Sequence, residues 1–121
     1  MHQMGLVLWI DKNEFSTSAL EKIFEKKGLE IYTINSAQDI QYLIEDLKPQ
    51  VIVMDVATYL GAEDRVNMFM AASEVMQSTP WISTGTRELN FPGAQMKGHI
   101  QKPLNVMIVA QEIQKILGLL N

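Results

Sequence analysis

Two aspartates and a lysine are the residues of this sequence whose types and positions could form one chemical site. Asp11 ends the run LVLWID, Asp55 ends the run VIVMD, and Lys102 lies in GHIQKP, directly before a proline. Two neighbouring carboxylates repel each other unless a cation lies between them, so a divalent metal or a lysine is expected there. A lysine opposite an aspartate also suits the stabilisation of a phosphoryl group on that aspartate.

The segments that lead to these side chains are typical of buried β-strands. The apolar runs before Asp11 and Asp55 do not alternate with polar residues, as expected for parallel strands that are covered on both faces. Three further short runs are rich in β-forming residues. Strands are therefore predicted over residues 6–10, 29–34, 51–54, 81–83 and 99–101.

Helical patterns lie between most of these strands. Apolar residues recur three and four positions apart, and the capping residues Asn13, Ser36 and Asn105 precede three of the stripes. Helices are predicted between Asn13 and Gly28, between Ser36 and Pro49, over residues 63–77, and after Asn105. Residues 85–97 contain Pro92 and Gly93, which break any long helix, so a fourth helix there is expected to be short or irregular.

The alternation of strands and helices predicts an α/β fold in a single domain over residues 1–121. We expect a flavodoxin-like (βα)5 doubly wound arrangement with a five-stranded parallel sheet, because each parallel connection must cross over and cover the sheet. Ligand sites of such sheets form at the carboxyl ends of the strands. Asp11, Asp55 and Lys102 are therefore expected to converge on one edge of the sheet.

Composition excludes several classes of protein. The apolar content of 47%, the charged content of 20% and the net charge of −4 are those of a globular chain without a basic surface for nucleic acid or anionic membranes. The chain has no cysteine, no signal peptide and no apolar stretch long enough to span a bilayer, so we expect a soluble, cytoplasmic protein. Because no P-loop, HExxH motif or nucleophile–base pair is present, the chain is not expected to be an enzyme.

The quoted runs, together with TPWISTG before residue 86, resemble the receiver domains of two-component response regulators, and the likeness extends over the whole chain. By this resemblance Asp55 matches the phosphoacceptor, and Asp11 matches the first of a pair of acids that bind Mg²⁺ together with it. Lys102 matches the lysine that pairs with the phosphoryl group. Thr84 loosely matches the switch hydroxyl, and His99 falls where receivers place a switching aromatic residue.

The sequence also departs from the receiver pattern. Lys12 occupies the position of the second acid, and Thr58 and Tyr59 stand where receivers usually carry Met-Pro. Counting from Pro80 puts Gly85, rather than Thr84, at the switch position. The metal ligands that remain are Asp11 and Asp55 alone, which puts Mg²⁺ binding in question.

Lys12 bears most directly on the mechanism. At an effective dielectric constant of about 20, two unit charges about 4 Å apart interact by roughly 4 kcal/mol, and a divalent ion doubles this. We therefore hypothesise that the Lys12 ammonium replaces the metal and holds Asp11 and Asp55, which would impair Mg²⁺-dependent phosphorylation of Asp55. The alternative is an ordinary solvated lysine that swings away from the site.

These observations lead to one functional prediction and a rival. The prediction is a signal-transduction receiver domain that acts through protein contacts. Its partner would be a histidine kinase, a phosphotransfer protein, another signalling protein, or a second copy bound through the last helix–strand–helix face; the domain could also belong to a longer regulator. The rival is a small flavodoxin-like module that binds a nucleotide or flavin phosphate, although two acids at that edge would repel a phosphate.

Simpler readings of single residues stay open. Asp11 could be no more than an N-cap of the first helix, and Asp55 no more than a cap within a loop. The STGT segment at residues 83–86 is explained by a turn, and the eight methionines by packing in the core. Met68 or Met70 could instead mark an adaptable partner surface.

Overall fold

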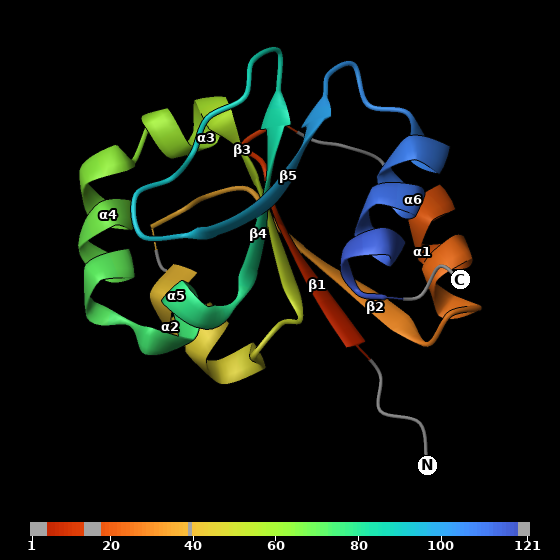
Figure 1. Cartoon of the computed structure of the whole chain (residues 1–121), viewed down its shortest axis with the longest axis horizontal. Coiled ribbons are helices and arrows are strands. Elements are labelled where there is room, and N and C mark those ends of the chain that lie inside the picture. The colour runs from red at the N-terminus through yellow and green to blue at the C-terminus, as the bar shows by residue number, and fades with distance from the viewer. Residues whose placement is uncertain (1–4, 14–17, 39, 119–121) are drawn as a thin grey trace.

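The computed structural model describes residues 5–13, 18–38 and 40–118. Five parallel strands form one sheet in the order β2-β1-β3-β4-β5, so the predicted flavodoxin-like fold is confirmed (Figure 1). The strands are β1 (Gly5–Ile10), β2 (Leu29–Ile34), β3 (Val51–Asp55), β4 (Pro80–Gly85) and β5 (Gln95–Gln101). All five predicted strands are present, and β5 begins four residues earlier than expected.

Helices cover both faces of this sheet. On one face lie α1 (Ser18–Glu25) and α6 (Val106–Ile116), and on the other α2 (Ile40–Leu47), α4 (Glu63–Ala72) and α5 (Glu74–Ser78), with the short α3 (Val56–Leu60) directly after β3 (Figure 1). The predicted cap of the last helix is confirmed, because the Asn105 side chain accepts hydrogen bonds from the backbone N–H groups of Met107 and Ile108. Within the described ranges no helix is long and apolar enough to cross a membrane.

The central strand β3 is buried along its whole length and separates two apolar clusters. Ile52 and Met54 point into the cluster beneath α2, α4 and α5, whereas Val51 and Val53 point into the cluster beneath α1 and α6. This alternation is the pattern of a strand covered on both faces. The absence of polar residues before Asp55 is thereby explained, and Asp55 itself lies where β3 reaches the carboxyl edge of the sheet.

The connection between β3 and β4 differs from the single helix that the sequence predicts over residues 63–77. The chain instead forms α4 and α5, which are separated at Ser73, whose side chain caps α5 by accepting a hydrogen bond from the Met76 N–H. The helix α3 was not predicted at all. Asp55 is its N-cap, so the carboxylate that ends β3 also begins a helix.

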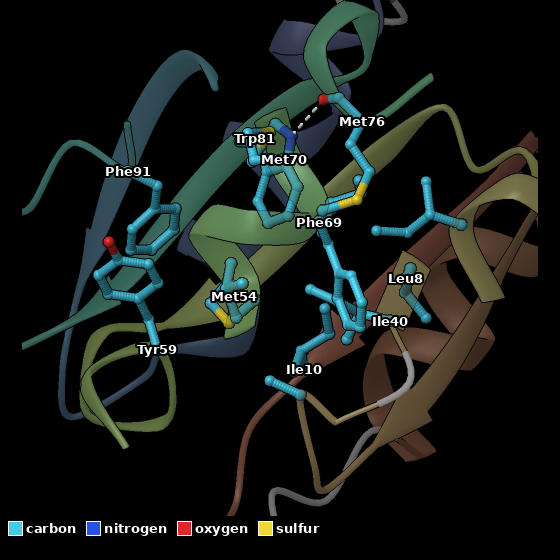
Figure 2. Packing of buried hydrophobic residues seen from close by; sticks show 14 residues of the cluster. Leu8, Ile10, Ile40, Met54, Tyr59, Phe69, Met70, Met76, Trp81 and Phe91 are labelled. Carbon is cyan, nitrogen blue, oxygen red and sulfur yellow. Dashed lines mark hydrogen bonds between the residues drawn. The ribbon is translucent and has the colours of Figure 1, made fainter. Parts of the chain in front are cut away.

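The connection between β4 and β5 contains no helix: residues 86–94 are all described, and none is helical. We expected a short or irregular helix there. An aromatic side chain holds this segment against the core instead. Phe91 is 2% exposed, and its ring centroid lies 4.5 Å from that of Tyr59 and 5.9 Å from that of Trp81. Figure 2 shows the Phe91 ring beside that of Tyr59 at one side of the larger apolar cluster, and the Trp81 indole N–H donating to the Met76 carbonyl.

Candidate functional site

The two aspartates and the lysine meet at the carboxyl edge of the sheet. The Lys102 Nζ atom lies 2.8 Å from Asp11 Oδ2 and 2.8 Å from Asp55 Oδ1. Both carboxylate side chains are 3% exposed, whereas the lysine side chain is 23% exposed. One ammonium group therefore bridges two buried carboxylates and leaves the three charges with a sum of −1.

The backbone around the sheet edge fixes these positions. The Asp11 N–H donates to the Ile34 carbonyl at the end of β2, and the Lys102 N–H donates to the Gly85 carbonyl at the end of β4. Each side chain thus extends from a strand end that a neighbouring strand holds in register. The three side chains therefore meet at one edge, as the order of the strands leads one to expect.

Thr58 completes the site, and the sequence did not identify it as a site residue. Its N–H and its Oγ1 each donate to Asp55 Oδ2 over 2.8 Å, and its Oγ1 also accepts from the Lys12 N–H over 2.8 Å. The Asn13 N–H donates to Asp11 Oδ1 over 2.9 Å. All four oxygens of the two carboxylates therefore have hydrogen-bond donors from the protein.

The pKa shifts follow from these contacts. Burial raises the pKa of the Asp55 carboxyl, but the hydrogen bonds from Lys102 and Thr58 outweigh it and hold the pKa below its ordinary value of 3.8. Burial lowers the pKa of the Lys102 ammonium, but the hydrogen bonds to Asp11 and Asp55 outweigh it and raise the pKa above 10.5. The charged form of each group is thus the stable one in the folded protein.

A pocket of about 310 Å³ opens beside this network. Asp55 and Lys102 line it, together with Asn13 from the segment after β1, residues of α3, and Thr86 and Arg87 from the segment after β4. Arg87 is exposed, so the rim of the pocket carries a second positive charge. The pocket gives solvent and small solutes a way to reach Asp55.

Two of the predicted site residues lie elsewhere than expected. The side chain of Lys12 is exposed, and both ion pairs found within the described part of the chain are made by Lys102. Lys102, rather than Lys12, is therefore the cation between the acids, and Lys12 contributes its backbone N–H to Thr58. Thr84 is fully buried and does not line the pocket, whereas Thr86 does.

His99 lies on β5 with its ring against β4. Its Nδ1 is 2.7 Å from Ser83 Oγ, and its Nε2 is 3.1 Å from the Gly85 carbonyl oxygen. Since a carbonyl oxygen can only accept, Nε2 carries a proton and donates to it. The ring therefore ties β5 to the two positions of β4 that flank Thr84, next to the pocket.

Asp11 and Asp55 are the carboxylates that a divalent cation such as Mg²⁺ would meet at this edge. Mg²⁺ takes six oxygen ligands in proteins and usually keeps several waters, so that one or two carboxylates are enough. No group of three acids or histidines that could hold a metal ion occurs among the residues that the structure describes. The two available carboxylates, Asp11 and Asp55, have their oxygens engaged by Lys102, Thr58 and Asn13.

Comparison with known proteins identifies this architecture. No protein-family model matches the sequence, and no curated protein sequence matches it. Among solved structures, the chain is similar to the receiver domain of a sensor histidine kinase from Pseudomonas aeruginosa PAO1, which was determined with a magnesium ion in its active-site cleft. The TM-score is 0.73 at 16% identity, over 96% of this chain and 99% of that one.

Two further structures agree with this result. A response regulator from Thermotoga maritima matches with a TM-score of 0.72 at 16% identity, over 96% of this chain and 99% of that one. A signal receiver domain from Clostridium thermocellum matches with a TM-score of 0.64 at 20% identity, over 93% and 97% of the two chains. The chain therefore has the fold of the receiver domains of two-component signalling.

Proposed function

We propose that this chain is a receiver-type signalling domain with Asp55 at the phosphoacceptor position, in which Mg²⁺-dependent phosphorylation is impaired and output runs through protein contacts. The observation that carries the proposal is the Lys102 bridge between Asp11 and Asp55, placed at the site edge of a receiver fold. The bridge supplies inside the protein the positive charge that a bound cation would otherwise bring.

Several features of the pocket support impaired metal binding. A cation at the two acids would have to compete with Lys102 and with the donors from Thr58 and Asn13. Lys12, in the position of a second acid, supplies no carboxylate ligand there, and its ammonium adds positive charge nearby. The exposed Lys12 side chain repels a divalent ion from a distance and is screened by salt.

The proposed output surface lies on β5 and the start of α6. Met107 and Ile108 are 58% and 51% exposed, although both are large apolar residues. A histidine kinase, a phosphotransfer protein, another signalling protein or a second copy of this chain would be the kind of partner that covers them. The helix-free segment at residues 86–94 leads into this face from the pocket.

Amide NMR during titration with Mg²⁺ and beryllofluoride tests the proposal. We expect small shifts around Asp11, Asp55 and Lys102 in the parent protein, larger shifts in Lys12→Asp, which regains a carboxylate, and none in Asp55→Asn. Shifts as large in the parent as in Lys12→Asp would contradict the proposed impairment. Saturable binding of flavin mononucleotide would instead favour the rival function, a flavodoxin-like ligand-binding module.

A further inference from the structure

The Asp55 side chain is held by two residues, and each of them engages one of its oxygens. Oδ1 faces Lys102 over 2.8 Å, whereas Oδ2 accepts both the N–H and the hydroxyl of Thr58 over 2.8 Å each. Thr58 is 5% exposed. The contact of its hydroxyl with the carboxylate therefore lies in a buried environment, where charge-assisted hydrogen bonds are strong.

The Thr58 hydroxyl also connects two loops. It accepts the Lys12 N–H over 2.8 Å while it donates its own proton to Asp55 Oδ2. Since a hydroxyl has a single proton, the bond from Lys12 fixes the oxygen in place, and the proton is left to point at the carboxylate. The hydroxyl is therefore oriented from both sides.

We propose that Thr58 is a positioning residue whose hydroxyl keeps the Asp55 carboxylate closed to cations and to phosphoryl donors. This inference deepens the proposed function and rests on it. A cation that ligates Oδ2 has to displace the hydroxyl proton, and a carboxylate that accepts three hydrogen bonds is a weaker nucleophile than one that accepts two. Lys102 supplies the charge that a metal would bring, and Thr58 occupies the lone pairs that a metal would use.

Two substitutions of Thr58 separate the effect of its hydroxyl from the effect of its packing. Thr58→Val keeps the branched shape and the backbone N–H but removes the hydroxyl, whereas Thr58→Ser keeps the hydroxyl. We expect Thr58→Val to bind Mg²⁺ about tenfold more tightly than the parent, which corresponds to about 1.4 kcal/mol, and Thr58→Ser to return to the parent Kd. The measurement is an amide NMR titration of the full chain with MgCl₂.

Incorporation of a phosphoryl group from acetyl phosphate, followed by intact-mass spectrometry, gives a second readout. In that reaction an Asp55 oxygen bonds to phosphorus, the bond from phosphorus to the acetyl oxygen breaks, and acetate leaves. We expect more modified protein for Thr58→Val than for the parent or Thr58→Ser, and none for Asp55→Asn. A merely structural role of Thr58 would lower modification in Thr58→Val.

Lys12→Asp distinguishes failure of this inference from failure of the proposed function. If Lys12→Asp tightens Mg²⁺ binding while the Kd of Thr58→Val stays within about twofold of the parent value, the receiver pocket is sound and the role of Thr58 is refuted. Equal changes in Thr58→Val and Thr58→Ser would also refute it. If neither Lys12→Asp nor Thr58→Val binds Mg²⁺, the proposal of a receiver-type pocket is refuted, and the inference about Thr58 is refuted as well.

Discussion

Removal of the Lys102 ammonium most directly tests the interpretation that Lys102 bridges Asp11 and Asp55. Lys102→Met keeps a long unbranched side chain, so most of the packing of the lysine stem is retained. It leaves Asp11 and Asp55 facing each other with side chains that are 3% exposed and no positive charge between them. The change therefore isolates the electrostatic role of the bridge.

The size of the effect follows from the burial of the three groups. Loss of one partner from a buried ion pair costs about 3–5 kcal/mol, because the remaining charge is left without compensation. The Lys102 side chain is 23% exposed, and water can enter the space it leaves, which favours the lower end of this range. We expect the free energy of unfolding at pH 7 to fall by about 3 kcal/mol, a large part of the stability of an ordinary domain.

Urea unfolding at a series of pH values provides the assay. In the parent, the lowered pKa of Asp55 contributes stability that is present above pH 3.8 and is lost as the pH falls through the folded-state pKa. In Lys102→Met, burial without a cation raises the pKa of the Asp55 carboxyl, so acidification protonates it and removes the uncompensated buried charge. The difference between the two proteins should therefore shrink from pH 7 to pH 4.

Lys97→Met serves as the matched control, because Lys97 is an exposed lysine on β5 that makes no ion pair in the described part of the chain. Its effect is expected to lie within about 0.5 kcal/mol. A loss of free energy of unfolding below about 1 kcal/mol for Lys102→Met would refute the interpretation that Lys102 forms a buried ion-pair bridge. A loss that is independent of pH would show that packing, rather than charge, is what the substitution removes.

Three further predictions follow from single contacts. Phe91→Ala should lower the free energy of unfolding by about 3 kcal/mol, measured in urea, because the ring is buried against Tyr59 and Trp81; an equal loss in Tyr42→Ala, whose side chain is 66% exposed, would contradict this. Asn105→Ala should cost about 1 kcal/mol through loss of the α6 cap, seen as a lower urea midpoint, whereas an unchanged midpoint would refute the cap. At alkaline pH, the raised pKa of Lys102 contributes stability that is complete below pH 10.5 and is lost as the pH rises through the folded-state pKa. Lys102→Met should lack that loss. Parallel alkaline profiles of the free energy of unfolding for parent and variant would contradict this prediction.

The fold and the meeting of the three charged residues could be predicted from sequence for a simple reason. In a parallel sheet every strand ends at the same edge, so a residue directly after a strand has its position fixed by the strand itself. Asp11 and Lys102 directly follow β1 and β5, and Asp55 is the last residue of β3, so all three have positions fixed in this way. Their convergence needed only the alternation of elements and no knowledge of side-chain packing.

The two alternatives for Lys12 could not be separated from sequence, because a sequence position fixes a backbone site but not the direction of a long side chain. The residue lies beside the two acids, yet it contributes its N–H while the ammonium turns to solvent. Thr58 was missed for a different reason. In the sequence it marks a departure from the receiver pattern. An aspartate that accepts the N–H of the residue three positions later is an ordinary helix N-cap, so Asp55 itself was the signal for the start of α3.

The missing helix between β4 and β5 connects these observations. Pro92 and Gly93 predict an interruption, but only the folded structure shows that Phe91 anchors the segment on Tyr59. Tyr59 follows Thr58 within the five-residue helix α3, which begins at the Asp55 cap. A change at the carboxylate that breaks the bonds to Thr58 therefore removes the cap of the same helix on which the 86–94 segment rests. The chemistry of Asp55 and the shape of the β4–β5 connection are joined through one turn of helix.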